Sequence, residues 1–189
     1  MIIVGKGPSL RGKNIGSWID GFNTVVKMTE GWQDEDYGRK CSYLVSTTMQ
    51  FYEINRYDLS KVEVIWLYYT RRPRRIRSTW RGMPDAVRIR TGFLGPIVVI
   101  NECISKWLSL YKQRRCHQRT IKDRVNYPSK GTAAILAAMY LTNEKIIYAV
   151  GFDCVLMGGK QSCLTHDWII EHRLIKECAA ERGVKIVSV

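Results

Sequence analysis

The sequence lacks a long apolar run and a recognisable export signal. No stretch reaches the ~20 consecutive apolar residues that a membrane-spanning helix needs. Residues 1–10 also lack the apolar region and the small-residue cleavage site of a secretory signal. We therefore expect no transmembrane segment, and a protein that is cytoplasmic or peripheral to a membrane.

The six cysteines lack a pattern. They form no Cys-x-x-Cys pair and no regular framework, which disfavours a disulfide scaffold. Their spacing relative to two histidines matches no standard zinc pattern; the residues concerned are Cys154, Cys163, His166 and His172. We expect reduced thiols and no bound metal ion.

Acidic residues are few. There are 17 Asp and Glu against 30 Lys and Arg, so the formal net charge is +13. The hydrophobic share of 46% and the charged share of 25% are ordinary for a globular protein, which excludes a disordered or collagenous chain. A domain usually takes ~100–200 residues. We predict one domain over 1–189 with a single large core, and the sequence leaves its oligomeric state open.

Short apolar runs alternate with segments of helical spacing. The runs expected to form strands are 1–4, 23–28, 42–46, 62–69, 86–89, 146–150 and 184–189. The segments expected to form helices are 49–55, 101–115, 131–141 and 167–182. This alternation predicts an α/β fold, a Rossmann-like and mainly parallel sheet with helices on both faces.

Residues 70–95 form the least regular part of the sequence. Prolines and glycines interrupt any helical pattern there, at Pro73, Gly82, Pro84 and Gly92. Arginines crowd the same segment: Arg71, Arg72, Arg74, Arg75, Arg77, Arg81, Arg88 and Arg90. We predict a basic, irregular insertion over about 70–95. A charge run is most often solvated surface, but this one also suits a polyanion. The contact residues would be Arg71, Arg72, Arg74, Arg75 and Arg77.

Three turns carry residues suited to a ligand. In open α/β sheets, ligands bind beyond the carboxyl ends of the strands. Gly5-Lys6-Gly7-Pro8-Ser9 follows the first expected strand, Ser129-Lys130-Gly131-Thr132 opens the alanine-rich helix, and Gly151-Phe152-Asp153 follows the strand 146–150. Ser9 and Ser129 are each expected to cap the helix that follows. Glycine lets a backbone approach a ligand closely, and a helix N-terminus offers N–H groups to an anion. Each turn taken alone also fits an ordinary structural turn.

The order of these features resembles the sialyltransferase-like glycosyltransferases of the bacterial family 42 and family 29 type, which use CMP-sialic acid. The family's Gly-Asn-Gly-Pro-Ser-Leu turn corresponds to residues 5–10, and its strand with Arg-x-Asn or Phe-Asn is matched by Phe22-Asn23. Its Gly-Lys-Lys-Cys-like segment corresponds to 38–41. Its small-residue helix, followed by a strand and Gly-x-Asp, corresponds to 131–153. The resemblance implies a sialyltransferase-like fold of the glycosyltransferase A-variant class.

The resemblance also implies a reaction without a metal ion or cofactor, in which a CMP-activated sugar is the donor. His166 then acts as the general base on the acceptor hydroxyl, a role that suits an imidazole with an unperturbed pKa of ~6.5. The residues implied to hold the nucleotide are Gly5, Lys6, Gly7, Pro8, Ser9, Asn23, Ser46, Ser129, Lys130, Gly131, Thr132, Gly151 and Asp153.

The chain departs from the family at the sugar and acceptor sites. Lys6 and Ser46 stand where the family has asparagines, and residues 154–165 lack the two tyrosines that hold the leaving phosphate. That segment is also shorter than the family's lid. A compact enzyme of this kind would transfer the sugar to an acidic glycan, a lipid or a nucleic acid, or hydrolyse the donor.

Two other functions fit the same residues. The pterin pyrophosphokinase-like proteins carry a similar Gly-x-Gly-Pro-Ser-Leu turn and Gly-x-Asp, and they transfer diphosphate from ATP. A non-catalytic protein could also keep this fold and use its arginines to bind nucleic acid or another polyanion. The sequence contains no helix-turn-helix, zinc-finger or ribonucleoprotein signature, which makes sequence-specific DNA reading a poor fit.

Overall fold

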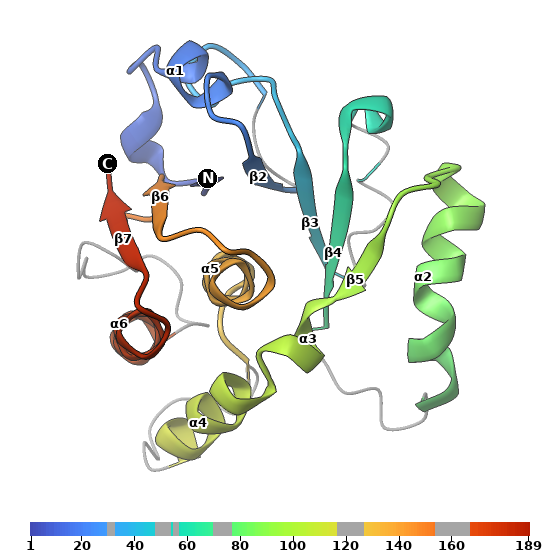
Figure 1. Ribbon diagram of the computed structural model, residues 1–189, viewed down its shortest axis with the longest axis vertical. Coiled ribbons are helices and arrows are strands. Elements are labelled where there is room, and N and C mark those ends of the chain that lie inside the picture. Colours follow the sequence, from blue (N-terminus) through green and yellow to red (C-terminus); the bar gives the residue numbers. More distant parts are fainter. Residues whose placement is uncertain (30–32, 48–53, 55–56, 70–76, 117–126, 154–166) are drawn as a thin grey trace.

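The computed structural model describes residues 1–29, 33–47, 54, 57–69, 77–116, 127–153 and 167–189. Seven strands form one sheet in the order β5-β4-β3-β2-β1-β6-β7, and all neighbours pair in parallel (Figure 1). The strands are β1 Ile2–Val4, β2 Val25–Met28, β3 Tyr43–Thr47, β4 Val64–Tyr68, β5 Ile97–Val99, β6 Ile146–Val150 and β7 Lys185–Ser188.

The central strands are apolar because helices and loops cover both faces of the sheet. In β1, Ile2 pairs with Val25 on one side and with Tyr148 on the other, so β1 lies between β2 and β6. All three residues of β1 are buried. Because all strands run in parallel, their carboxyl ends lie at one edge, called here the carboxyl edge of the sheet.

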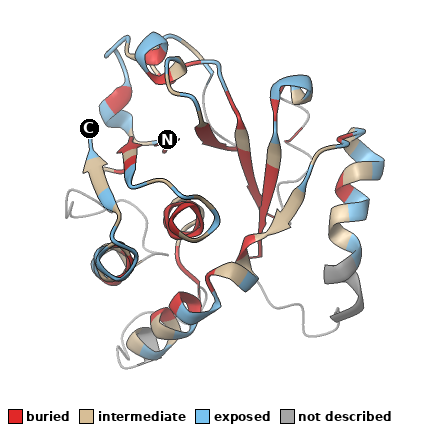
Figure 2. Ribbon diagram, in the orientation of Figure 1, coloured by how far each residue is buried: buried red, intermediate tan, exposed pale blue. Residues whose placement is uncertain are grey.

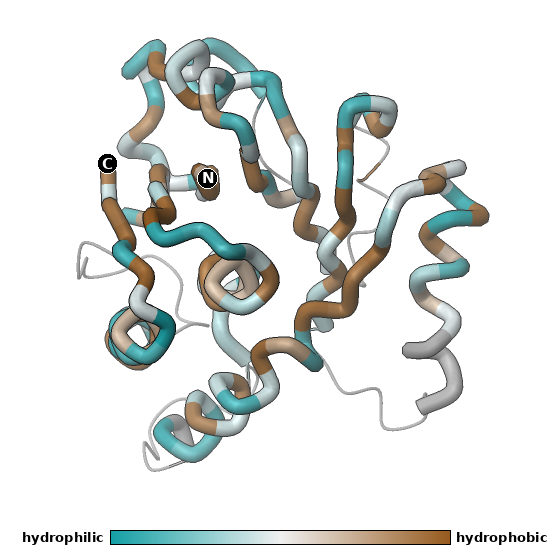
Figure 3. Tube along the Cα trace, viewed as in Figure 1, coloured by the Kyte–Doolittle hydropathy of each residue, from teal (hydrophilic) through white to brown (hydrophobic). Residues whose placement is uncertain are grey.

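One face of the sheet is covered by four helices. They are α3 Ile100–Cys103, α4 Ser105–Cys116, α5 Lys130–Leu141 and α6 Trp168–Arg182. The alanines of α5 let it approach the strands closely, and α5 is buried along most of its length (Figure 2). The last helix ends at Gly183, whose φ of 61° requires the left-handed conformation that glycine favours. Figure 3 shows the continuous hydrophobic run that leads from β5 into α3.

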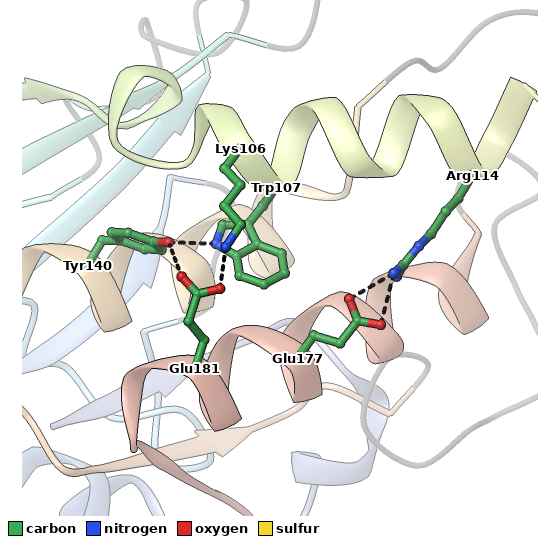
Figure 4. A network of polar contacts seen from close by, with 6 residues as sticks. All are labelled: Lys106, Trp107, Arg114, Tyr140, Glu177 and Glu181. Carbon is green, nitrogen blue, oxygen red and sulfur yellow. Dashed lines mark hydrogen bonds and ion pairs between the residues drawn. The ribbon is translucent and has the colours of Figure 1, made fainter.

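Polar contacts hold α4 against α6 (Figure 4). Lys106 forms an ion pair with Glu181, and the Arg114 Nη2 donates to both Glu177 oxygens at 2.9 and 2.8 Å. The Trp107 Nε1 donates to the Tyr140 hydroxyl of α5 at 3.0 Å. The two ion pairs are partly exposed, so their contribution to stability is small.

The opposite face is covered by shorter elements. Near β1, α1 Gly16–Asp20 and the 3-10 turn η1 Pro8–Leu10 enclose a small apolar cluster. Over β3 and β4 lie the 3-10 turn η3 Leu59–Lys61 and α2 Arg77–Thr91. Figure 1 shows α2 beside β5, at the end of the sheet far from α6.

Two sequence-based expectations are wrong in the region 70–95. Residues 77–91 form the helix α2 although Pro84 lies inside it, and the strand expected at 86–89 belongs to this helix. Met83 and Val87 are one helical turn apart and pack against the cluster on β3 and β4, which outweighs the backbone hydrogen bond that Pro84 removes. The strand beside β4 is instead β5, at 97–99.

The remaining expectations differ in detail. The helix expected at 101–115 is divided at Ile104 into α3 and α4, and the helix expected at 49–55 falls almost wholly outside the described residues. Ser9 does not cap a helix, since Pro8–Leu10 is a single 3-10 turn without a side-chain cap. In the parts of the chain that the structure describes, no helix has the length and apolar character to cross a membrane.

Candidate functional site

The glycine turn, residues 5–9, is joined directly to the end of β6. The N–H of Gly5 donates to Val150 O at 2.7 Å, and the N–H of Gly7 donates to Gly151 O at 2.8 Å. A Cβ on Gly5 would overlap Gly151 O, and a Cβ on Gly7 would lie 2.6 Å from the same oxygen. The glycines of this turn are therefore required by the neighbouring backbone.

Asp153 holds the far end of the glycine turn. Its Oδ2 accepts from the Ser9 N–H at 3.0 Å, and its Oδ1 accepts from the Ser9 hydroxyl. Both partners are partly accessible, with Ser9 exposed and Asp153 half-buried. The structure therefore brings these two sequence-predicted site residues together, and it uses them to bind each other.

A buried tyrosine contacts the glycine turn, and a buried lysine holds the residue that follows this tyrosine. The Tyr37 hydroxyl donates to Gly7 O at 3.0 Å. The Lys27 ammonium donates to the carbonyl of Gly38, the next residue. Lys27 is only 1% exposed, and burial lowers its pKa, an effect that Cys41 and Asp20 oppose. Sequence reasoning missed both supports, because a lysine inside a strand gives no signal of where its ammonium goes.

The α5 turn, residues 129–132, is built around a buried carboxylate. Glu171 of α6 has no exposed surface. Its Oε1 accepts from the Ser129 N–H at 2.9 Å, and its Oε2 accepts from the Ser129 hydroxyl at 2.6 Å and from the Thr132 hydroxyl. The Ser129 hydroxyl oxygen also accepts from the Thr132 N–H at 3.2 Å, so Ser129 caps α5 as expected. A negative charge is thus already present at this helix N-terminus, where it is favourable.

The two turns meet at the ring of Phe152. A Cβ on Gly5 would lie 3.2 Å from Phe152 Cδ2, and a Cβ on Gly131 would lie 2.6 Å from Phe152 Cε1. Phe152 is 8% exposed. Both turns therefore lie close together at the carboxyl edge, and a phenylalanine side chain fills the space between them.

Lys130 extends from the α5 turn to the end of β2. Its ammonium donates to the Thr29 hydroxyl at 3.3 Å, and Thr29 directly follows β2. Sequence reasoning missed Thr29, although its place directly after the strand expected at 23–28 puts it at the carboxyl edge.

Two sequence-predicted site residues lie elsewhere. Asn23 precedes β2 and is exposed at the opposite edge of the sheet, because Phe22-Asn23 leads into the strand and does not follow it. Ser46 lies inside β3 with no exposed surface, and its hydroxyl donates to Thr47 O at 3.2 Å. Neither residue belongs to the site that the glycine turn and the α5 turn form.

Several sequence-predicted residues fall outside the described residues. They are His166, Arg71, Arg72, Arg74 and Arg75. Arg77 is the first residue of α2, but its side chain is not described. Among the residues that the structure does describe, no group of three or more His, Cys, Asp and Glu could hold a metal ion.

The similarity of this chain to known proteins lies in its fold. A scan of protein-family models finds no match, and a search of curated proteins finds none either. A solved structure is similar over 98% of this chain and 68% of its own, with a TM-score of 0.60 and 16% sequence identity: a mammalian sialyltransferase in complex with Gal-beta-1-3GalNAc-ortho-nitrophenol. The chain has a sialyltransferase-like fold. The α/β, Rossmann-like class expected from the sequence is confirmed.

Proposed function

We propose that the chain is a sialyltransferase-like glycosyltransferase that takes a CMP-activated sugar as its donor. The sialyltransferase-like fold over 98% of the chain carries this proposal. The arrangement at the carboxyl edge supports it, because the glycine turn and the α5 turn meet there at Phe152, at the edge where open α/β sheets bind ligands.

The nucleotide would lie over Phe152. The space beside the glycines of the two turns is already occupied by the Gly151 backbone and the Phe152 ring, so the nucleotide would lie on the outer side of that ring. In this position the phosphate comes near Lys130, which is half-buried. The family holds its leaving phosphate with two tyrosines that this chain lacks between 154 and 165. We assign their role to the Lys130 ammonium, because a fixed positive charge stabilises the charge that develops on a leaving phosphate.

In the proposed reaction, the acceptor hydroxyl gives its proton to the His166 imidazole and its oxygen bonds to the anomeric carbon of the donor. The bond from that carbon to the phosphate oxygen breaks, and its electron pair leaves with CMP. If water takes the place of the acceptor, the same bonds form and break, and the donor is hydrolysed. His166 directly precedes Asp167, which caps α6 through the Ile170 N–H at 3.0 Å, and Glu171 ties the first turn of α6 to the α5 turn.

Nucleotide binding is tested by thermal shift with CMP, CDP, UDP, ADP and ATP, with and without magnesium, followed by product analysis on CMP-sialic acid. We expect CMP alone to raise the Tm, and Lys130→Met to lose most of that shift. Lys145→Met is the matched control, because Lys145 is exposed at the start of β6, on the opposite edge of the sheet. His166→Ala should keep the CMP shift and lose turnover.

Other outcomes assign other functions. Magnesium-dependent release of AMP from ATP would identify a pyrophosphokinase-like enzyme. Salt-sensitive binding of nucleic acid without any nucleotide-induced shift would identify a non-catalytic polyanion-binding protein. Equal turnover by His166→Ala and the unmodified chain would remove His166 from the mechanism.

A further inference from the structure

The tip of α2 exposes two large aliphatic side chains that no core uses. Ile89 is 87% exposed and Leu94, three residues beyond the helix, is 92% exposed. The same segment packs other apolar residues inward: Val87 and Phe93 are buried against strands β3 and β4. The core contacts of α2 are therefore complete without Ile89 and Leu94, and both side chains face water at the end of the sheet.

Basic residues accompany this apolar tip. The last turn of α2 carries two arginines, Arg88 and Arg90. Arg88 is fixed beside the tip, because its Nη1 donates to Gly95 O at 2.8 Å and so spans the turn that presents Leu94. Asp85 is exposed on the same helix.

We propose that the tip of α2, formed by Ile89 and Leu94 with Arg88 and Arg90, docks on an anionic lipid bilayer. A helix with basic residues and outward aliphatic side chains binds in the headgroup region, where the aliphatic groups leave water and the arginines meet anionic lipids. Nucleic acid would satisfy the arginines, but its phosphates offer nothing to two exposed aliphatic side chains. The bilayer satisfies both observations. This inference is independent of the proposed nucleotide chemistry.

Vesicle binding tests the proposal. The full chain is mixed with vesicles of phosphatidylcholine, with and without phosphatidylglycerol, and the bound fraction is measured by flotation. We expect binding to the anionic vesicles only, weakened by added salt because exposed charges are screened. The double variant Ile89→Ser/Leu94→Ser should lower the partition coefficient about tenfold or more, from the loss of two buried aliphatic groups.

A matched control replaces two other exposed aliphatic side chains with serine. Ile169 is 76% exposed at the start of α6 and Val189 is 57% exposed at the end of the chain, so Ile169→Ser/Val189→Ser should bind vesicles like the unmodified chain. Circular dichroism and Tm verify that both double variants fold. Four results would overturn the proposal: no binding to anionic vesicles, equal binding to neutral ones, the same loss in both double variants, or binding of single-stranded polyuridylate without vesicle binding.

Discussion

Replacing Glu171 with glutamine perturbs the contact that joins α6 to the α5 turn. The carboxylate is fully buried and accepts three hydrogen bonds, from the Ser129 N–H, the Ser129 hydroxyl and the Thr132 hydroxyl. A hydrogen bond to a charged group contributes ~1.5–3 kcal/mol. Glutamine keeps one acceptor oxygen and places an NH2 group where a second acceptor was, so at least one such bond is lost.

We therefore expect Glu171→Gln to lower the free energy of unfolding by about 2–3 kcal/mol. For a chain of this size, ~1 kcal/mol corresponds to a Tm change of ~2–4 °C, so the Tm should fall by about 4–12 °C. Urea unfolding followed by circular dichroism gives the free energy, and calorimetry gives the Tm. Because Glu171 also holds the α5 turn beside Phe152, the Tm shift produced by CMP should shrink as well.

Glu177→Gln is the matched control, since it makes the same chemical change on the same helix. Glu177 is a partly exposed partner of Arg114, and an ion pair of that kind is worth ~0.2–1 kcal/mol. A Glu171→Gln variant as stable as Glu177→Gln would refute the view that the buried carboxylate organises this turn.

Three further changes test the packing of the site and the core. Gly7→Ala places a Cβ 2.6 Å from an Asp153 oxygen and from Gly151 O, so denaturant unfolding should show a loss of about 1–3 kcal/mol; an unchanged midpoint would mean that the glycine turn opens freely. Phe152→Ala removes the ring that both turns contact, and we expect a loss of about 3–5 kcal/mol in the same assay, whereas a loss below about 1 kcal/mol would show that the ring is not packed. Burial raises the pKa of Cys178 from 9.0 to about 12, so the folded thiol keeps its proton above pH 9 while the unfolded thiol releases it. The stabilisation is complete below pH 9 and is lost as the pH rises toward 12, by about 1.4 kcal/mol per pH unit. Cys178→Ala should lack this loss, and parallel slopes of the two proteins in reducing buffer between about pH 9 and 11 would contradict the assignment.

The strands and the buried helix could be predicted from the sequence because their signals are local. The apolar run 146–150 suits a strand in a sheet covered on both faces, and the alanine-rich segment 131–141 suits a helix buried against that sheet. Both elements form as expected. Residues 77–91 could not be predicted in this way. Pro84 and Gly82 signal a break, and the packing that overrides them involves Val87 and strands β3 and β4, which are more than 15 residues away in the sequence.

The site could be predicted in its turns but not in its contacts. The glycine turn and the α5 turn were recognisable as strings of small residues, and they do lie together at the carboxyl edge. The partners that fix them are distant in sequence: Ser9 binds Asp153 across 144 residues, and Ser129 binds Glu171 across 42. No spacing rule connects such pairs. The misplacement of Asn23 has a different origin: the strand expected at 23–28 already begins at Asn23, which places this residue at the amino end of β2 and away from the carboxyl edge.

The contacts within the two turns determine how loss of function must be interpreted. Asp153 and Glu171 bind groups of the chain itself, at Ser9 and at Ser129, so removing either acid weakens the fold whether or not a nucleotide binds. A variant at these positions that loses activity therefore says little about a ligand. Lys130 differs, because its ammonium lies at a half-buried position and donates to the Thr29 hydroxyl at 3.3 Å, a hydrogen bond worth ~1 kcal/mol or less to stability. A Lys130→Met protein that keeps its Tm and no longer responds to CMP would separate binding from folding, which no substitution of the two acids can do.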